Sequence, residues 1–229
     1  MQIKIALIGY GKMGQIIERI ALDQGHHIVA RVHSGSWDLE AVKEADVCVE
    51  FTRPDAVVEN ISRLAPLGKP IVVGTTGWHD RLEEVLALVE EHQIGLLYSS
   101  NFSIGVNLLF SIVAHAACEI QSFEYDISGV EMHHRNKKDQ PSGTAKELSR
   151  IVKEKIDREI PFSSIRCGSH PGAHTILFDS ACDTITISHE ARNREGFAKG
   201  ALLAANWLIG RKGVYNFFDL LNDKNNICV

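Results

Sequence analysis

Short apolar runs alternate with longer segments of helical periodicity over the first hundred residues. Five runs have the length of buried strands, and they cover residues 3–8, 27–32, 45–52, 70–73 and 94–98. Between them, apolar residues recur every three or four positions, most clearly over 80–92. Strands that alternate with helices predict a parallel sheet covered by helices on both faces, which is the doubly wound α/β architecture.

The second half of the chain has a different pattern. We predict helices over 104–120, 144–157 and 194–211, and strands over 125–132, 164–167, 174–178 and 183–189. The last strand alternates, so that Ile185 and Ile187 face the same way. This alternation is typical of an antiparallel or mixed sheet with one covered face. The pattern predicts a second, smaller α+β domain with a mixed sheet.

Composition describes an ordinary globular protein. The 229 residues are 45% hydrophobic and 23% charged, and the net charge of −5 argues against nucleic acid as the main partner. No apolar run reaches the roughly 18 residues of a membrane helix, and the first residues lack the flanks of a signal peptide. Five cysteines stand without any CxxC pair, which predicts reduced thiols in a cytoplasmic protein: Cys48, Cys118, Cys167, Cys182 and Cys228.

A glycine-rich turn follows the first strand. Gly9, Gly11 and Gly14 form GxGxxG between the strand at 3–8 and a helical pattern that begins near Ile16. The first glycine permits a tight turn, the second lets the backbone approach a pyrophosphate, and the third lets helix pack on strand. The sequence therefore predicts a Rossmann-type dinucleotide site with the pyrophosphate at the helix N-terminus. The alternative is a glycine turn that serves packing only.

The end of the second strand lacks the acidic residue that usually binds the adenosine ribose. His33 and Ser34 stand there instead, and Arg31 precedes them. Without a carboxylate to repel a 2′-phosphate, we predict NADPH as cofactor, or use of both NADPH and NADH. The alternative is that His33 and Ser34 are solvated loop residues.

Three later strands also end in small or polar residues. These ends are Phe51-Thr52, Gly74–Gly77 and Ser99–Phe102. Ligands of open parallel sheets bind at the carboxyl ends of the strands. We therefore predict that these segments and the glycine turn line one cofactor site.

One stretch, 131–145, concentrates groups suited to a small anionic substrate. His133 and His134 can transfer protons near neutral pH, and Lys137 can neutralise a carboxylate. Ser142, Thr144 and the N–H groups of a helix start can bind an anion. A metal is not predicted, because the histidines are adjacent and no acidic cluster accompanies them.

The stretch Glu-Met-His-His-Arg-Asn-Lys-Lys-Asp-Gln-Pro-Ser-Gly-Thr-Ala at 131–145 resembles the signature of the 4-hydroxy-tetrahydrodipicolinate reductase (dihydrodipicolinate reductase) family. The resemblance extends over most of the chain, through the glycine turn and segments near 51–54, 74–77, 101–107, 172–174 and 189–201. It implies an enzyme of lysine and diaminopimelate biosynthesis that reduces a cyclic imine dicarboxylate with NADPH or NADH. It also implies a homotetramer, a dinucleotide-binding domain at 1–103 and 194–229, and a substrate-binding and oligomerisation domain at 104–193.

The resemblance also assigns residues. His133 matches the acid/base histidine, Lys137 the catalytic lysine and His134 a substrate-binding histidine, while Ser142, Gly143 and Thr144 match the turn that binds substrate. The cofactor contacts implied are Gly9, Tyr10, Gly11, Lys12, Met13, Gly14, Gly74, Thr75, Thr76, Ser99, Ser100, Asn101 and Phe102. The chain departs from relatives in a short loop at 33–45 and in Ala173, where relatives often have Glu. Arg194 could approach the substrate or form a salt bridge at a helix start.

Two other functions are weighed against this one. The chain could be another Rossmann oxidoreductase that acts on a small anionic substrate. It could also be a non-catalytic regulator that senses NADPH through its Rossmann domain.

Overall fold

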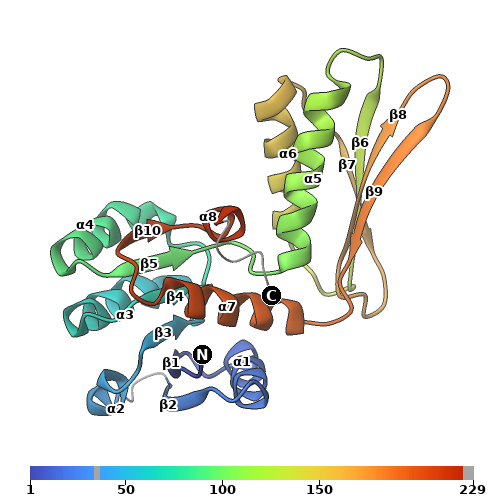
Figure 1. Cartoon of the computed structure of the whole chain (residues 1–229). Coiled ribbons are helices and arrows are strands. Elements are labelled where there is room, and N and C mark those ends of the chain that lie inside the picture. Colours follow the sequence, from blue (N-terminus) through green and yellow to red (C-terminus); the bar gives the residue numbers. More distant parts are fainter. Residues whose placement is uncertain (34–36, 224–229) are drawn as a thin grey trace. The chain divides into compact units, whose positions relative to one another are not determined.

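The computed structural model describes residues 1–33 and 37–223, and Ser34 lies outside them. The chain forms two compact units. Unit 1 joins Met1–Ser103 to the C-terminal segment that begins at Phe197, and unit 2 is Ile104–Gly196 (Figure 1).

Unit 1 is built on a parallel six-stranded sheet with the order β10-β5-β4-β3-β1-β2. The strands are β1 (Lys4–Ile8), β2 (His27–Val32), β3 (Val47–Glu50), β4 (Ile71–Val73), β5 (Gly95–Tyr98) and β10 (Gly213–Tyr215). The chain moves outward from β1 in both directions, so the carboxyl ends of β1, β3, β4 and β5 lie at one edge. This arrangement confirms the predicted Rossmann-type fold.

Helices cover both faces of this sheet. They are α1 (Lys12–Asp23), α2 (Leu39–Lys43), α3 (Val57–Leu64), α4 (Leu82–His92), α7 (Glu195–Leu208) and α8 (Phe217–Asn222), with 3₁₀ turns at Pro54–Ala56, Ala65–Leu67 and His79–Arg81. Ala6 and Ile8 of β1 join one core with the apolar residues of α2, α3 and α4. Their neighbours Ile5 and Leu7 are equally buried and point the opposite way, so both faces are covered.

The C-terminal segment completes unit 1 in a way that the hydrophobic pattern does not predict. In this segment β10 adds a strand beside β5, and α8 follows it. The prediction contains neither of these elements, and it also lacks α2, which lies between β2 and β3. Each is only three to six residues long, too short for a periodic pattern. α7 packs so closely that a Cβ at Gly200 would collide with the carbonyl of Phe102.

Unit 2 is a four-stranded mixed sheet with two helices. Its elements are α5 (Ile104–Ile120), β6 (Asp126–His133), α6 (Gly143–Ile156), β7 (Phe162–Arg166), β8 (Ala173–Asp179) and β9 (Thr184–Glu190), with strand order β7-β6-β8-β9. β6 pairs with β7 in parallel, and the other pairs are antiparallel. The predicted mixed sheet is therefore confirmed.

One face of this sheet is covered by α5 and α6 (Figure 1). Ile127, Ile176 and Phe178 point to that side and are buried. The alternation of β9 agrees with the sequence: Ile187 is half-buried on the covered face, whereas Ile185, farther from the start of β8, remains 44% exposed. On the opposite face Ile165 is 41% exposed and Leu177 half-buried.

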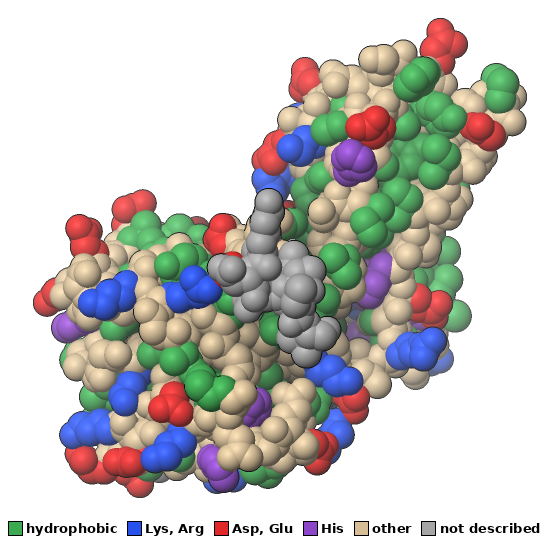
Figure 2. Space-filling model, in the orientation of Figure 1, with side chains coloured by type: hydrophobic (Ala, Val, Ile, Leu, Met, Phe, Trp, Pro, Cys, Tyr) green, Lys and Arg blue, Asp and Glu red, His purple; other side chains and the backbone are tan. Residues whose placement is uncertain are grey.

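Hydrophobic side chains also remain exposed along α5. Leu108, Ile112 and Phe123 are 48%, 53% and 62% exposed, at and beyond that helix. Figure 2 shows hydrophobic side chains on the surface of unit 2. Among the described residues, no helix has both the length and the apolar character needed to cross a membrane.

Candidate functional site

The start of α1 in unit 1 has the geometry of an anion cradle. Gly9 adopts φ +95°, which favours glycine, and a Cβ at Gly14 would run into the Gly9 carbonyl. Gly11 meets neither restriction, since a Cβ there would find nothing within 4 Å. It is the N-cap of α1, with no side-chain cap and no acidic residue in the first turn. The helix start therefore offers its N–H groups and open space to a ligand.

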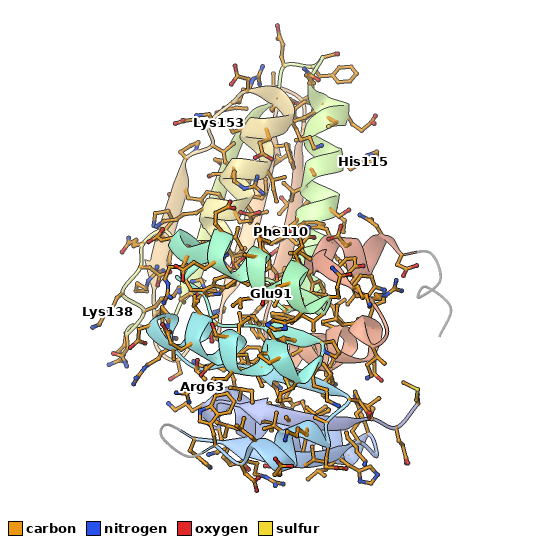
Figure 3. The ribbon with its side chains drawn as sticks, turned by 90° about the vertical axis from the view of Figure 1, so that its left-hand side faces the viewer. Arg63, Glu91, Phe110, His115, Lys138 and Lys153 are labelled. Atoms are coloured by element: carbon orange, nitrogen blue, oxygen red, sulfur yellow. The ribbon has the colours of Figure 1, made fainter. Side chains whose placement is uncertain are left out.

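Two cavities adjoin this turn at the carboxyl edge of the sheet. One, of about 540 Å³, is lined by Gly9 and Gly11 together with His33, Trp37 and Arg63. The guanidinium of Arg63, which comes from α3 (Figure 3), lies 5.3 Å from the Trp37 ring. The other, of about 410 Å³, is lined by predicted cofactor residues and their neighbours: Gly11, Lys12, Met13, Phe51, Thr52, Pro54, Gly74, Thr75 and Thr76. The glycine turn and the segments that follow β3 and β4 thus line one cavity, and its use by a cofactor stays a prediction.

Other predicted cofactor residues have partners within the protein. Tyr10 donates its hydroxyl to Glu18, and Arg31 donates Nε to the same carboxylate at 2.8 Å. Phe102 is 2% exposed and packs against Phe51 and Phe217. The segment 99–102 does not line either cavity, so its predicted contact with the cofactor stays a prediction.

A buried carboxyl group that sequence reasoning missed lies beneath these loops. Glu50 ends β3, is fully buried and accepts hydrogen bonds from Thr52 Oγ1 and from Asn60 Nδ2 at 3.2 Å. Burial raises its pKa. Thr52 in turn donates its N–H to Thr75 Oγ1 at 2.7 Å, so this network holds the ends of β3 and β4 together.

In unit 2, the predicted anion-binding turn begins helix α6. Ser142 is its N-cap, and its Oγ accepts the N–H of Ala145 at 3.2 Å. The same hydroxyl is hydrogen-bonded to Nε2 of His174 at 2.9 Å, and Ser142 is 2% exposed. Gly143 is exposed and Thr144 half-buried at the helix start. Ser142 thus shapes the turn from within, and its direct contact with a substrate stays a prediction.

His133, at the end of β6, is held by two charged residues. Its Nδ1 donates to Oε2 of Glu131, a fully buried carboxylate two residues earlier on the same face of the strand. Oε1 of Glu131 accepts Nη2 of Arg166 at 2.7 Å. Burial would raise the pKa of Glu131, but hydrogen bonds from Arg166, Ser164 and His133 outweigh it and hold the pKa at about 2. Burial lowers the pKa of His133 despite Glu131.

Lys137 follows in the loop between β6 and α6. Its Nζ lies 2.8 Å from Oδ1 of Asp139, and its side chain is 23% exposed. His134 is half-buried and Lys138 is exposed at the outer edge of the loop (Figure 3). The structure therefore brings His133, Lys137 and the α6 start into one region of unit 2.

His174 adds a third group with metal-binding atoms near Glu131 and His133. The ligand atoms of the three lie within 4.8 Å of one another. Both carboxylate oxygens of Glu131 already accept hydrogen bonds, one of them from a guanidinium. A metal ion would have to displace Arg166, so this arrangement favours a hydrogen-bonded network over a cation site.

Sequence reasoning missed the participation of Glu131, Arg166 and Gly172 in this network. Only the spacing of Glu131 and His133 on one strand gave a signal, because residues i and i+2 share a face. Arg166 reaches the cluster through the pairing of β7 with β6, and Gly172 lies against the His133 ring. The order of residues along the chain does not predict that Arg166 and Gly172 lie beside Glu131 and His133. Arg194 is exposed and forms no salt bridge with another described residue.

Comparison with known proteins gives the same picture for the whole chain. Residues 3–102 match the family described as dihydrodipicolinate reductase, N-terminus, and residues 105–221 match dihydrodipicolinate reductase, C-terminus. The chain belongs to the dihydrodipicolinate reductase family. The predicted family is therefore confirmed, and with it the class of NAD(P)H-dependent oxidoreductase.

Individual dihydrodipicolinate reductases are similar to this chain over most of its length. The 4-hydroxy-tetrahydrodipicolinate reductase of Christiangramia forsetii is 36% identical, over 96% of this chain and 98% of its own. The enzyme of the same name from Methanoregula boonei is 36% identical, over 95% of this chain and 97% of its own. The dipicolinate-bound enzyme of Paenisporosarcina sp. TG-14 has a TM-score of 0.81 at 25% identity, over 94% of this chain and 98% of its own. These matches do not favour the two alternative functions.

Proposed function

We propose that this chain reduces 4-hydroxy-tetrahydrodipicolinate to tetrahydrodipicolinate in diaminopimelate and lysine biosynthesis. The observation that carries the proposal is the site in unit 2, where a buried, carboxylate-bound His133, Lys137 and the start of α6 come together. These groups suit a dicarboxylate that gains negative charge as it is reduced. In the balanced reaction a hydride and a proton enter the ring, and water leaves.

Unit 1 would bind the reduced nicotinamide cofactor, which supplies the hydride. Gly11 and the first turn of α1 would hold the pyrophosphate, since a Cβ at Gly11 would occupy open space rather than protein. The threonines at 75 and 76 line the adjoining cavity and would contact the rest of the cofactor. Residues 1–103 and 194–229 are therefore proposed as the dinucleotide-binding domain, and 104–193 as the substrate-binding and oligomerisation domain.

We propose that NADPH and NADH are both accepted and that NADPH is preferred. No carboxylate stands at the end of β2, and His33 and Arg63 line the cavity beside it. Arg31 is already paired with Glu18, so it is the weaker candidate for a 2′-phosphate. KM values for the two cofactors, measured side by side, test this. His33→Asp should raise KM for NADPH more than KM for NADH.

In unit 2, His133 would transfer a proton at the reacting ring and Lys137 would stabilise the developing negative charge. His134, Gly143 and Thr144 would bind the substrate carboxylates, with Ser142 shaping the turn. One relative is a dipicolinate-bound enzyme, and we propose dipicolinate, a planar dicarboxylate, as the probe for this site. It is called the dicarboxylate probe below.

We also propose that the protein is a cytoplasmic homotetramer. The sheet face of unit 2 opposite α5 and α6 is the support for association, because Ile165 is exposed there and Leu177 only half-buried. The described cysteines are all free thiols, as in a reducing compartment.

The decisive experiment is a coupled assay. The preceding synthase generates the substrate, and loss of reduced-nicotinamide absorbance reports turnover. We expect oxidation of NADPH that depends on substrate, and its absence with both cofactors would refute the proposal. A non-catalytic sensor would bind NADPH equally well in wild type and in Lys137→Met but turn over in neither.

A further inference from the structure

We infer that Glu131 and Arg166 are positioning residues for the proposed reaction, in which one buried carboxylate orients His133 and one guanidinium ties that carboxylate to the loop that carries Lys137. The inference rests on the proposed function for its chemistry. Neither residue needs to touch the substrate. Both would act through the two groups that do.

The carboxylate decides which nitrogen of His133 carries a proton. Glu131 is ionised at neutral pH, because its hydrogen bonds hold its pKa at about 2. An ionised carboxylate only accepts hydrogen bonds, so Nδ1 of His133 must be the donor. A neutral imidazole bound in this way has its lone pair on Nε2. Glu131 therefore presents Nε2 as the atom that exchanges a proton with the substrate.

The surroundings of Nε2 are compatible with that task. Gly172, just before β8, lies close to this atom, since an added Cβ there would be only 3.0 Å from Nε2. His174 packs edge-on against the ring, with centroids 5.1 Å apart. No described residue forms a hydrogen bond with Nε2. The ring is thus fixed on its Nδ1 side and unengaged on its Nε2 side.

Arg166 connects the two proposed catalytic residues. Besides Glu131, its guanidinium donates to the carbonyls of Asp139 at 2.7 Å and Lys137 at 3.4 Å. Its side chain is only 15% exposed. A planar guanidinium can hold several acceptors at fixed angles, which an ammonium group cannot do. Arg166 therefore couples the orientation of His133 to the path of the backbone beneath Lys137.

The charges that face His133 come from every neighbouring element. Glu131 of β6 favours its protonated form, whereas Arg166 of β7 and Lys137 of the loop disfavour it, and His174 of β8 lies in ring contact. Loss of the Glu131 charge alone should leave the opposing cations in place. The pKa of His133, and the pH profile that it controls, should then move downward.

Glu131→Gln is the test variant, and Glu154→Gln is its matched control. Both change a glutamate that accepts from an arginine in unit 2, but Glu154 lies on the exposed surface of α6. We expect Glu131→Gln to lower kcat at least about tenfold, with KM for NADPH and the Kd of the dicarboxylate probe within about twofold of wild type. The pKa that His133 contributes to the pH profile of kcat should fall by about one unit. If the pH profile of Glu131→Gln coincides with that of wild type, the inference fails.

Nitrogen NMR of the imidazole rings gives a readout that does not need turnover. The His133 signals can be assigned by their loss in His133→Gln. We expect the Nδ1–H tautomer in wild type and a mixture in Glu131→Gln, because an amide has one oxygen for two donors. If wild-type His133 carries its proton on Nε2, the inference fails, even if the glutamine variant does not fold. Failure of the proposed function alone would leave the NMR result intact.

Arg166→Lys tests the coupling. It keeps the positive charge and loses the planar fork, so a purely electrostatic role predicts nearly unchanged kcat. We expect kcat to fall at least about fivefold while KM for NADPH is retained. Unchanged kcat in this variant would overturn the assignment of Arg166.

Discussion

Lys137 Nζ lies 2.8 Å from Oδ1 of Asp139. Burial would raise the pKa of Asp139, but Lys137 and the N–H of Gly143 hydrogen-bond to this carboxylate and lower the pKa. Asp139 thus engages Lys137, which we assign to the developing negative charge, and Gly143, which we assign to a substrate carboxylate. A bound dicarboxylate has to share them with it or displace it.

Asp139→Asn should therefore strengthen binding of the dicarboxylate probe. A partly exposed ion pair is worth about 0.2–1 kcal/mol, so we expect Kd to fall by up to about fivefold. Titration calorimetry measures this directly. Asp157→Asn, at the other end of α6, is the control and should leave Kd unchanged. A weaker complex in Asp139→Asn would mean that Asp139 mainly holds Lys137 in place.

Gly11→Ala should separate cofactor binding from folding. Its Cβ meets no protein atom, so we expect Tm to stay within about 2 °C of wild type. The Cβ would occupy the proposed pyrophosphate position, and the Kd of NADPH should rise at least about tenfold. Gly14→Ala is the contrast, because its Cβ would collide with the Gly9 carbonyl and should cost roughly 1–3 kcal/mol of stability. Unchanged NADPH affinity in Gly11→Ala would place the pyrophosphate elsewhere.

Gly172→Ala should impair the reaction through His133. The residue has φ +145°, and its Cβ would press on Nε2 of His133. We expect strain of ~1 kcal/mol, a lower kcat and an unchanged KM for NADPH. Gly168→Ala is matched, since Gly168 also has a positive φ, +51°, but no atom near its Cβ. Equal kcat in the two variants would show that strain alone accounts for the effect.

His174 should make the protein sensitive to acid. Burial, and then the charge of His133, lower its pKa to about 3, below its ordinary value of 6.5. Between these values the unfolded chain binds a proton that the folded chain does not, so stability is complete above about pH 6.5 and is lost as pH falls. The loss is about 1.4 kcal/mol per pH unit.

Urea unfolding of His174→Gln at pH 7 and pH 5 measures that contribution. From pH 7 to pH 5 the wild type should lose about 2 kcal/mol more stability than the variant does. His115→Gln changes an exposed histidine of α5, and its free energy of unfolding should change with pH as that of wild type does. If wild type and His174→Gln lose the same free energy of unfolding between pH 7 and pH 5, the prediction is wrong.

Leu177→Glu should dissociate the proposed tetramer. Leu177 lies on the sheet face of unit 2 that α5 and α6 leave uncovered, and a buried unpaired carboxylate there would cost several kcal/mol. Light scattering should show a smaller species. Leu108→Glu, at an exposed apolar position of α5, is the control and should leave the mass unchanged. If Leu108→Glu alone dissociates the protein, α5 is the interface instead.

The sequence alone determined the α/β architecture of the first hundred residues and most of unit 2. Long apolar periodicities are local properties, and they predicted nearly every strand and helix longer than six residues. The sequence also predicted the glycine turn, because its geometry is local. Gly9 has φ +95°, and Gly14 lies against the Gly9 carbonyl only five residues away. The stretch 131–145 likewise carries His133 and Lys137 only four residues apart.

Tertiary structure decided what surrounds those residues. Arg166 is 33 positions beyond His133 in the numbering, and only the parallel pairing of β7 with β6 places it beside Glu131. Gly172 and His174 arrive through the antiparallel approach of β8. Strand register depends on the packing of the whole unit, so a residue's neighbours across a sheet cannot be obtained from its neighbours along the chain. The histidine is therefore evident in the sequence, and the charge that orients it appears only in the fold.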